Sequence, residues 1–275
     1  MGTFAAVVQM CSGPEVGPNL LRAAELVKQA GDRGASLVVL PENFALMTAA
    51  EERKRAAAEA LSPGEPGPIV SAMAAAASSA QTYLLLGGMP ERGPAGDPAG
   101  RIYNSCVLLN PAGGISAVYR KIHLFDVFIP DGATYRESSV VAPGEAPVVA
   151  RTPFYDLGLS VCYDLRFPEL YRALAAKGAG VVAVPAAFTL HTGRDHWHVL
   201  LRARAIENQV YVLAAAQNGR HDGNRQTFGH SLIADPWGTV LAEIPDGEGV
   251  AIAEIDLERR ERIRRELPVL THRRL

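Results

Sequence analysis

The segment best suited to covalent chemistry is SVCYDLRFPE, residues 160–169, in which a cysteine follows an apolar run. A cysteine thiolate is a strong nucleophile, and an adjacent base can generate it from the thiol. Pro168, shortly after the cysteine, is a signal for the start of a helix. Two interpretations follow. Cys162 packs in the core as a small apolar side chain, or a strand-to-helix elbow presents it as a nucleophile.

No histidine is indicated as the base for this cysteine, because the spacing of the histidines singles out none of them. The seven are His123, His191, His196, His198, His221, His230 and His272. His196 and His198 share the cluster HTGRDHWH, but two residues of separation on a helix place them roughly 200° apart, so one face cannot offer both to an ion. No cysteine or glutamate stands at the spacing of known zinc signatures. The sequence therefore predicts no metal site and no cofactor.

A carboxylate is the other candidate for the base. Glu42 comes directly after the apolar run at 37–40 and a proline. The carboxyl ends of buried parallel strands are where ligand sites lie in α/β folds. Partial burial would raise the pKa of Glu42 toward neutrality and suit it to proton transfer. On its own, however, a proline and a glutamate after a strand are also ordinary turn residues.

Two further charged residues have both a structural and a functional interpretation. Lys121 lies in the strand-like stretch VYRKIHLFD, residues 118–126. Such a lysine either extends its amine from a strand edge into water or holds a fixed positive charge beside a developing oxyanion. Glu137, in the loop segment YRESS, is either an exposed loop side chain or part of a site.

Candidate substrate contacts lie near the cysteine and after a later apolar run. Arg166 follows Cys162 closely, and its guanidinium is suited to bind a substrate carboxylate through two hydrogen bonds. The structural alternative is an ion pair with Asp164 or Glu169. Phe188 and Thr189 follow the run GVVAVPA, and we expect them to line the pocket for the acyl group.

The elements that position these residues alternate between strands and helices. Short apolar runs of strand length lie at 4–10, 36–42, 83–89, 103–110, 157–162, 180–186, 210–217, 230–236 and 250–256. Helical patterns cover 17–33, 67–80 and 196–209, and irregular loops are expected at 91–101 and 130–147. The alternation predicts an α/β fold with parallel pairing, and no linker divides the single domain at 1–275.

Composition excludes several classes of protein. The 275 residues are 48% hydrophobic, with 27 basic against 29 acidic side chains, which gives no basic surface for nucleic acid. The mixed-charge run at 258–267 predicts a solvated helix face. No apolar run reaches the ~20 residues of a membrane span, and no signal peptide is recognised. Cys11 and Cys106 are predicted to pack in the core. Three widely spaced cysteines indicate a reducing compartment, so we expect a cytoplasmic protein without membrane partners.

Four segments occur together in order: LPENF, YRKIHLF, YRES and SVCYDLRFPEL. With HWHVLLRARAIENQVYV and GHSLIADPWGTV, they resemble the nitrilase, or carbon–nitrogen hydrolase, superfamily over nearly the whole chain. The resemblance implies a Glu-Lys-Cys triad at Glu42, Lys121 and Cys162, with Glu137 as an accessory glutamate. It also implies a four-layer α-β-β-α sandwich that forms a homodimer or a higher homo-oligomer.

A narrower resemblance rests on GGMPERG, RIYNSCVLLN, AAAQNGRHDG and LPVLTHRRL, which are similar to the deaminated-glutathione amidase branch. It implies hydrolysis of a primary amide of a small carboxylate-bearing substrate to an acid and ammonia, through a thioester. Lys121 and the backbone N–H of Tyr163 would hold the oxyanion. Omega-amidase acting on α-ketoglutaramate-type substrates, N-carbamoyl hydrolase and nitrilase remain open. So does a catalytically silent metabolite-binding protein on the same fold.

Overall fold

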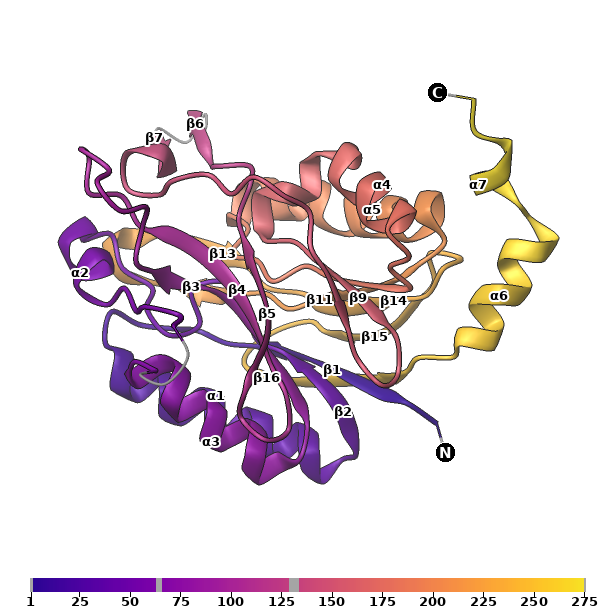
Figure 1. The fold of residues 1–275 in the computed structure, drawn as a ribbon, viewed down its shortest axis with the longest axis horizontal. Coiled ribbons are helices and arrows are strands. Elements are labelled where there is room, and N and C mark those ends of the chain that lie inside the picture. The colour runs from indigo at the N-terminus through magenta and orange to yellow at the C-terminus, as the bar shows by residue number, and fades with distance from the viewer. Residues whose placement is uncertain (1, 63–65, 129–133, 275) are drawn as a thin grey trace.

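Two facing β-sheets with helices on both outer sides make up the architecture. The computed structural model describes residues 2–62, 66–128 and 134–274. In Figure 1, one helical layer lies beneath the first sheet and another lies above the second, with the two sheets between them. The predicted four-layer α-β-β-α sandwich is therefore confirmed.

The first sheet contains six strands in the order β16-β1-β2-β3-β4-β5. Their bounds are β16 (Gly249–Glu254), β1 (Phe4–Gln9), β2 (Ala35–Val39), β3 (Tyr83–Glu91), β4 (Tyr103–Leu109) and β5 (Ile115–Arg120). Strands β1, β2 and β3 pair in parallel, and the other pairs are antiparallel. Because β5 is antiparallel to β4, which is antiparallel to β3, the carboxyl ends of β2 and β5 lie at the same edge.

The second sheet also contains six strands, in the order β15-β14-β11-β10-β9-β8. Their bounds are β15 (Val240–Ile244), β14 (Ser231–Ala234), β11 (Tyr211–Ala214), β10 (Val181–Ala183), β9 (Asp156–Leu159) and β8 (Val149–Arg151). The three central strands β9, β10 and β11 are parallel and fully or almost fully apolar, as expected for strands that are covered on both faces.

Alternating side chains of the first sheet divide between two apolar clusters. In β1, Val7 packs toward the second sheet and Val8 packs toward the helices. The helices on that side are α1 (Val16–Asp32) and α3 (Pro68–Ala80), and α4 (Pro168–Ala176) and α5 (Leu190–Asn208) cover the second sheet. This alternation follows from the two-residue period of a strand.

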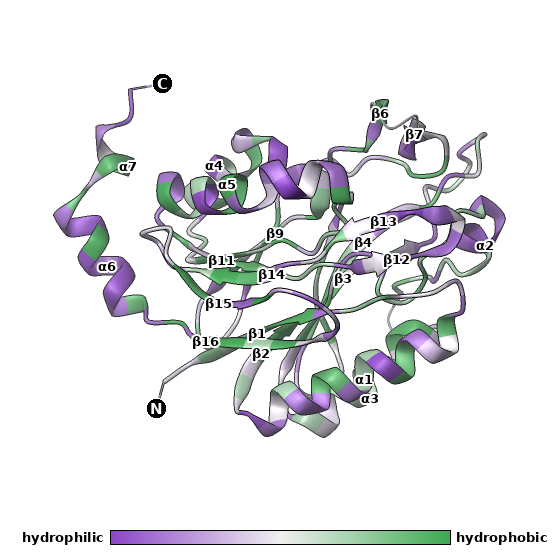
Figure 2. Cartoon of the chain, turned by 180° about the vertical axis from the view of Figure 1, so that it is seen from behind, coloured by the Kyte–Doolittle hydropathy of each residue, from purple (hydrophilic) through white to green (hydrophobic). Residues whose placement is uncertain are grey.

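The remaining elements are short. They are the helices α2 (Glu51–Ala56), α6 (Leu257–Glu266) and α7 (Val269–His272), the strands β6 (Asp126–Phe128), β7 (Thr134–Arg136), β12 (Asn218–Arg220) and β13 (Gln226–Phe228), and the 3₁₀ turns η1 (Glu137–Ser139), η2 (Cys162–Arg166) and η3 (Asp222–Asn224). Figure 2 shows α6 as mainly hydrophilic, and Ile263 is its buried residue, so the predicted solvated face is confirmed.

All nine predicted strands and all three predicted helices are present, with differences at their ends. Helix α5 begins at Leu190 rather than at 196, because the Thr189 side chain accepts a hydrogen bond from the Thr192 amide and caps an earlier turn. The loop predicted at 130–147 contains β7 and η1, while its residues 130–133 lie outside the described ranges.

The prediction that Cys11 packs in the core is wrong, because its side chain is exposed just beyond β1. Cys106, in contrast, is completely buried in β4, as predicted. No helix within the described residues is long and apolar enough to cross a membrane. We propose that residues 1–275 form one domain, since strands of both sheets contribute to the same apolar cluster.

The cluster between the sheets makes a direct prediction for stability. Leu37 in β2 is buried there, so Leu37→Ala should lower the free energy of unfolding by about 2–5 kcal/mol through lost burial and a residual cavity. Urea denaturation measures this change. The matched control Leu21→Ala, on the exposed face of α1, should change it by less than about 0.5 kcal/mol. Equal losses in the two variants would contradict this account of the core.

Candidate active site

Cys162 lies at a sharp elbow between the second sheet and helix α4. Strand β9 ends at Leu159, and Cys162 opens η2 with a φ of +50°, a left-handed conformation that is uncommon for a side chain other than glycine. Its amide donates to the Pro185 carbonyl at 2.8 Å, beyond the end of β10. Strained backbone of this kind gathers at functional sites, and here it favours the elbow interpretation over simple packing.

The buried carboxylate of Asp164 holds this elbow in place. One oxygen accepts from the Val161 amide at 2.8 Å and from the Tyr119 hydroxyl at 2.7 Å. The other contacts the amide and the ring Nδ1 of His123 at 3.1 and 2.7 Å. Asp164 is thus fully engaged away from Arg166, and the ion pair between these two residues considered from the sequence is wrong.

Glu42 extends from the carboxyl end of β2 and is buried. Its Oε1 accepts from Lys121 Nζ and from Asn104 Nδ2, both at 3.0 Å, and its Oε2 accepts from the Ala187 amide at 3.1 Å. Burial acts to raise the pKa of Glu42, but the charge of Lys121 and the hydrogen bonds around the carboxylate outweigh it and lower the pKa. The expectation of a raised pKa at Glu42 is therefore wrong.

Lys121 is the first residue after β5, and its amine points into the protein. Nζ lies 3.0 Å from Glu42 Oε1 and 2.8 Å from Glu137 Oε2. Burial acts to lower the pKa of Lys121, yet the two carboxylates raise it, so the amine stays positively charged. Lys121 is 2% exposed, and the alternative of an edge lysine that reaches into water is wrong.

Glu137 is also part of this charged group rather than a free loop side chain. Both of its carboxylate oxygens accept from Lys121 Nζ, at 2.9 and 2.8 Å. The Phe125 amide donates to Oε2 at 2.6 Å, and Asn104 Nδ2 donates to Oε1 at 3.3 Å. Glu137 and Glu42 together thereby fix the position of the Lys121 amine.

The Cys162 thiol lies within the electric field of this cluster. Burial, followed by the negative charge of Glu42, raises the pKa of Cys162, while Lys121 and the Ala187 amide act to lower it. At neutral pH the sulfur therefore keeps its proton beside an ionised carboxylate. This is a nucleophile and base arrangement in which the proton moves only when substrate is attacked.

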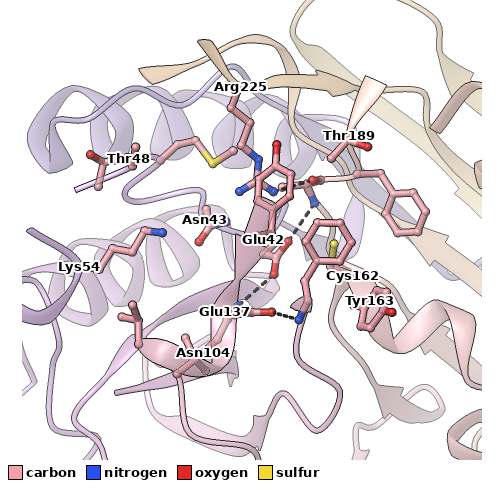
Figure 3. A pocket seen from close by; sticks show the side chains of 18 of the residues that line it. Glu42, Asn43, Thr48, Lys54, Asn104, Glu137, Cys162, Tyr163, Thr189 and Arg225 are labelled. Carbon is pink, nitrogen blue, oxygen red and sulfur yellow. Dashed lines mark hydrogen bonds between the residues drawn. The ribbon is translucent and has the colours of Figure 1, made fainter. Parts of the chain in front are cut away.

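Glu42, Lys121 and Cys162 all line one cavity of about 800 Å³. Figure 3 shows the Glu42 and Cys162 side chains in it. Tyr163, Arg166, Phe188 and Thr189, all predicted near the substrate, lie on its wall. The Tyr163 amide donates to no acceptor among the described residues. The guanidinium of Arg166 lies 5.2 Å from the Phe188 ring and 3.2 Å from His196 Nδ1, and no carboxylate of the described chain forms an ion pair with it.

Sequence reasoning missed several residues of this cavity. Asn104, which donates to both Glu42 and Glu137, stands in β4 as a buried amide among apolar residues, and that context was a usable signal. Lys54 and Arg225 also line the cavity. They come from α2 and from the link to β13, and no sequence motif connects these two segments.

A cluster of potential metal ligands lies outside the cavity. The ligand atoms of His198, His230 and Glu243 are all within 4.8 Å of one another. His198 Nε2 and His230 Nδ1 contact the same Glu243 oxygen at 2.9 and 2.7 Å, so hydrogen bonds already occupy these groups. None of the three lines the cavity that contains Cys162.

Comparisons with known proteins identify the family. The carbon-nitrogen hydrolase family model matches residues 4–265. The chain belongs to the carbon–nitrogen hydrolase family. It is therefore a hydrolase that acts on carbon–nitrogen bonds of linear amides in small-molecule substrates.

Relatives in this family cover almost all of the chain. The deaminated glutathione amidase of Synechocystis sp. (strain PCC 6803 / GT-S) is 47% identical over 98% of this chain and 97% of its own length. The human deaminated glutathione amidase is 46% identical over 98% of this chain and 82% of its own length. The crystal structure of Saccharomyces cerevisiae Nit3, a member of branch 10 of the nitrilase superfamily, superposes with a TM-score of 0.87 at 35% identity, over 99% of this chain and 97% of that one.

Proposed function

We propose that this carbon–nitrogen hydrolase cleaves deaminated glutathione, or a small carboxylate-bearing amide close to it, through a thioester on Cys162. The observation that carries the proposal is the convergence of the Cys162 thiol, the ionised Glu42 and the charged Lys121 at one cavity. The relatives named deaminated glutathione amidase, at 46–47% identity, support the choice of substrate.

In the first stage Cys162 is acylated. Glu42 takes the thiol proton as the sulfur attacks the amide carbonyl carbon, so that a carbon–sulfur bond forms and the carbonyl electrons move to oxygen. Lys121 and the backbone N–H of Tyr163 stabilise this oxyanion. The Tyr163 amide is suited to this role because it has no acceptor among the described residues.

In the second stage the tetrahedral intermediate collapses. Glu42 returns its proton to the leaving nitrogen, the carbon–nitrogen bond breaks, and a thioester remains on Cys162. Glu42 then deprotonates a water that attacks the thioester carbonyl, the carbon–sulfur bond breaks to release the free acid, and Glu42 returns the proton to the Cys162 sulfur. From a primary amide the nitrogen leaves as ammonia, whereas the amides of a glutathione derivative are secondary, so there it leaves as the amine of a dipeptide. The same proton transfers serve both substrates.

Arg166, Phe188 and Thr189 are proposed to contact the substrate, and Glu137 is proposed to act indirectly. Arg166 binds a substrate carboxylate, a role that its lack of an ion pair within the described residues leaves open. Phe188, whose ring lies 5.2 Å from the Arg166 guanidinium, and Thr189 also line the cavity and contact the acyl group. Glu137 acts through Lys121, whose amine it holds, and is a positioning residue.

The competing functions are other reactions of the same three residues and binding without catalysis. Omega-amidase, N-carbamoyl hydrolase and nitrilase activities would use the same three residues on other substrates, so only a substrate panel separates them. A catalytically silent metabolite-binding protein is disfavoured, because Glu42 and Cys162 keep the protonation states that an amidase needs.

Turnover of a substrate panel tests the proposed function. We expect the protein to hydrolyse deaminated glutathione with release of a free amine, and to do so faster than it releases ammonia from α-ketoglutaramate, N-carbamoyl amino acids or simple nitriles. Cys162→Ala should lower kcat/KM by at least about 10³-fold while the thermal unfolding transition is kept. Separate assays for primary amine and for ammonia measure these rates.

Cys11→Ala is the matched control, because Cys11 is exposed and does not line the cavity. It should leave kcat/KM unchanged. Near wild-type activity in Cys162→Ala would refute the role of Cys162 as the nucleophile. Faster turnover of nitriles than of amides would refute the amidase assignment.

The pKa shifts predict the pH dependence of catalysis. The active form has an ionised Glu42 and a protonated thiol, so kcat/KM should fall only as pH drops through the lowered pKa of Glu42. Because the pKa of Cys162 is raised, no increase in rate is expected near the pKa of about 8.5 of an ordinary thiol. A flat profile of kcat/KM between about pH 6 and 8 is the expected result. A tenfold rise per pH unit in that range would instead indicate a free thiolate as the reactive form.

We also propose that the chain forms a homodimer through α5 and works in the cytoplasm. Val199 and Ile206, seven residues apart on one face of α5, are 67% and 47% exposed, and the nearby Trp237 is 56% exposed. Three unpaired cysteines fit a reducing compartment.

Light scattering should give twice the 29.3 kDa chain mass, and Val199→Glu should shift the protein toward monomer. The control Leu21→Glu, on α1, should not change the mass. A wild-type protein with the mass of one chain would refute the dimer.

A further inference from the structure

Two cations line the cavity without forming an ion pair with any described carboxylate, and neither has a role in the reaction described above. Lys54 extends from α2, and its amine forms no hydrogen bond or ion pair with any described residue. Arg225 lies just before β13, and its Nε is buried without an acceptor in the described part of the chain. Both side chains line the cavity that contains Cys162, and in Figure 3 Lys54 lies to the left of Glu42 and Arg225 above it.

Both side chains line one cavity, and the positive charge of Arg225 acts on the Lys54 amine. After burial, the charge of Arg225 is the largest influence that lowers the pKa of Lys54. Mutual repulsion of this kind is relieved when an anion lies between the charges. Arg225 is held in place, because its Nη2 donates to the Ala187 carbonyl at 3.0 Å and its guanidinium lies 5.5 Å from the Tyr135 ring.

Nearby carboxylates of the protein are engaged elsewhere. Asp222 accepts from the Thr48 hydroxyl at 2.7 Å and from the Ala49 amide. Glu51 pairs with Arg55 at 3.3 Å. Neither approaches Lys54 or Arg225 within ion-pair distance, so the anion that would complete the pair has to come from outside the described chain.

The position of Lys54 and Arg225 in the cavity indicates which part of the substrate these two cations contact. In the proposed reaction Glu42 protonates the leaving nitrogen, so the leaving group extends along the Glu42 side of the cavity. Arg225 is on that side, since its charge contributes to lowering the pKa of Glu42 and it binds the carbonyl of Ala187, whose amide binds Glu42. Arg166 lies instead beside Tyr163 and Phe188, next to the acylated sulfur.

We infer that Lys54 and Arg225 form a second carboxylate subsite, which binds an anionic group on the leaving amine of the substrate. This inference rests on the proposed function and extends it, because it makes the enzyme selective for amides that carry a carboxylate on each side of the scissile bond. Arg166 binds the acyl-side carboxylate, and Lys54 with Arg225 binds the one that departs with the amine. Of the substrates considered, deaminated glutathione has this pattern and α-ketoglutaramate, which releases ammonia, does not.

The test compares deaminated glutathione with its analogue in which the terminal glycine carboxylate is a carboxamide. Wild-type enzyme should prefer the carboxylate in kcat/KM by on the order of 10- to 100-fold, as for a charge-assisted hydrogen-bonded contact. In Lys54→Met this preference should fall to within about 3-fold, mainly through a higher KM, and Lys54→Arg should restore most of it. For α-ketoglutaramate, whose leaving group is ammonia, Lys54→Met should lower kcat/KM much less than it does for deaminated glutathione.

Arg53→Met is the matched control, since Arg53 is a cation on the same helix that pairs with Glu15 and does not line the cavity. It should keep the full preference. Equal losses on the carboxylate and carboxamide substrates in Lys54→Met, or no preference in the wild type, would overturn the subsite and leave the amidase proposal standing. If the wild type hydrolyses neither compound but hydrolyses another amide, the proposed substrate fails and the inference fails with it.

Discussion

The interaction on which the site depends is the buried ion cluster of Lys121 with Glu42 and Glu137. Charges removed from water are tolerated only when they are paired and their remaining hydrogen-bonding capacity is met. Lys121 Nζ meets both carboxylates at 2.8–3.0 Å, while Asn104 and the amides of Ala187 and Phe125 bind the other carboxylate positions. These contacts hold the charged groups in place, and the pairing of Lys121 with the carboxylates lowers the pKa of Glu42 and raises the pKa of Lys121.

The four-layer fold explains how residues so distant in sequence meet. Glu42 and Lys121 follow β2 and β5, whose carboxyl ends lie at the same edge of the first sheet. Cys162 and Ala187 follow the parallel strands β9 and β10 of the facing sheet. Packing of the two sheets through a shared apolar core then brings both edges to one cavity, as ligand sites in α/β folds lie beyond the carboxyl ends of strands. The core that stabilises the protein is thus also what sets the distance between base and nucleophile.

Local sequence patterns predicted the helices, the strands and the candidate catalytic residues well. Periodicity, and the short segments around Glu42, Lys121 and Cys162, depend only on residues that are neighbours in the sequence. Periodicity alone indicated only an α/β fold, and the layers came from the family resemblance. The failures have a common physical cause. The direction of the Glu42 pKa shift, the exposure of Cys11 and the presence of Lys54 and Arg225 in one cavity all depend on how distant segments pack. A buried glutamate alone has a raised pKa, and only its partners reverse the sign.

The charge of the cluster also accounts for having two glutamates around one lysine. In the resting site Glu42 and Glu137 are ionised against one Lys121 ammonium, and the thiol is neutral. When Glu42 takes the thiol proton in the proposed reaction, its negative charge disappears and an equal charge forms on the substrate oxygen. Lys121 then exchanges one anionic partner for another, and the net charge of the cavity does not change. Glu137 stays bound to Lys121 throughout, so the amine needs little movement, which is the condition for effective electrostatic stabilisation of an oxyanion. With Glu42 as its only carboxylate partner, Lys121 would have no protein anion to hold its amine in place once Glu42 is protonated, and the amine would be positioned by the oxyanion alone.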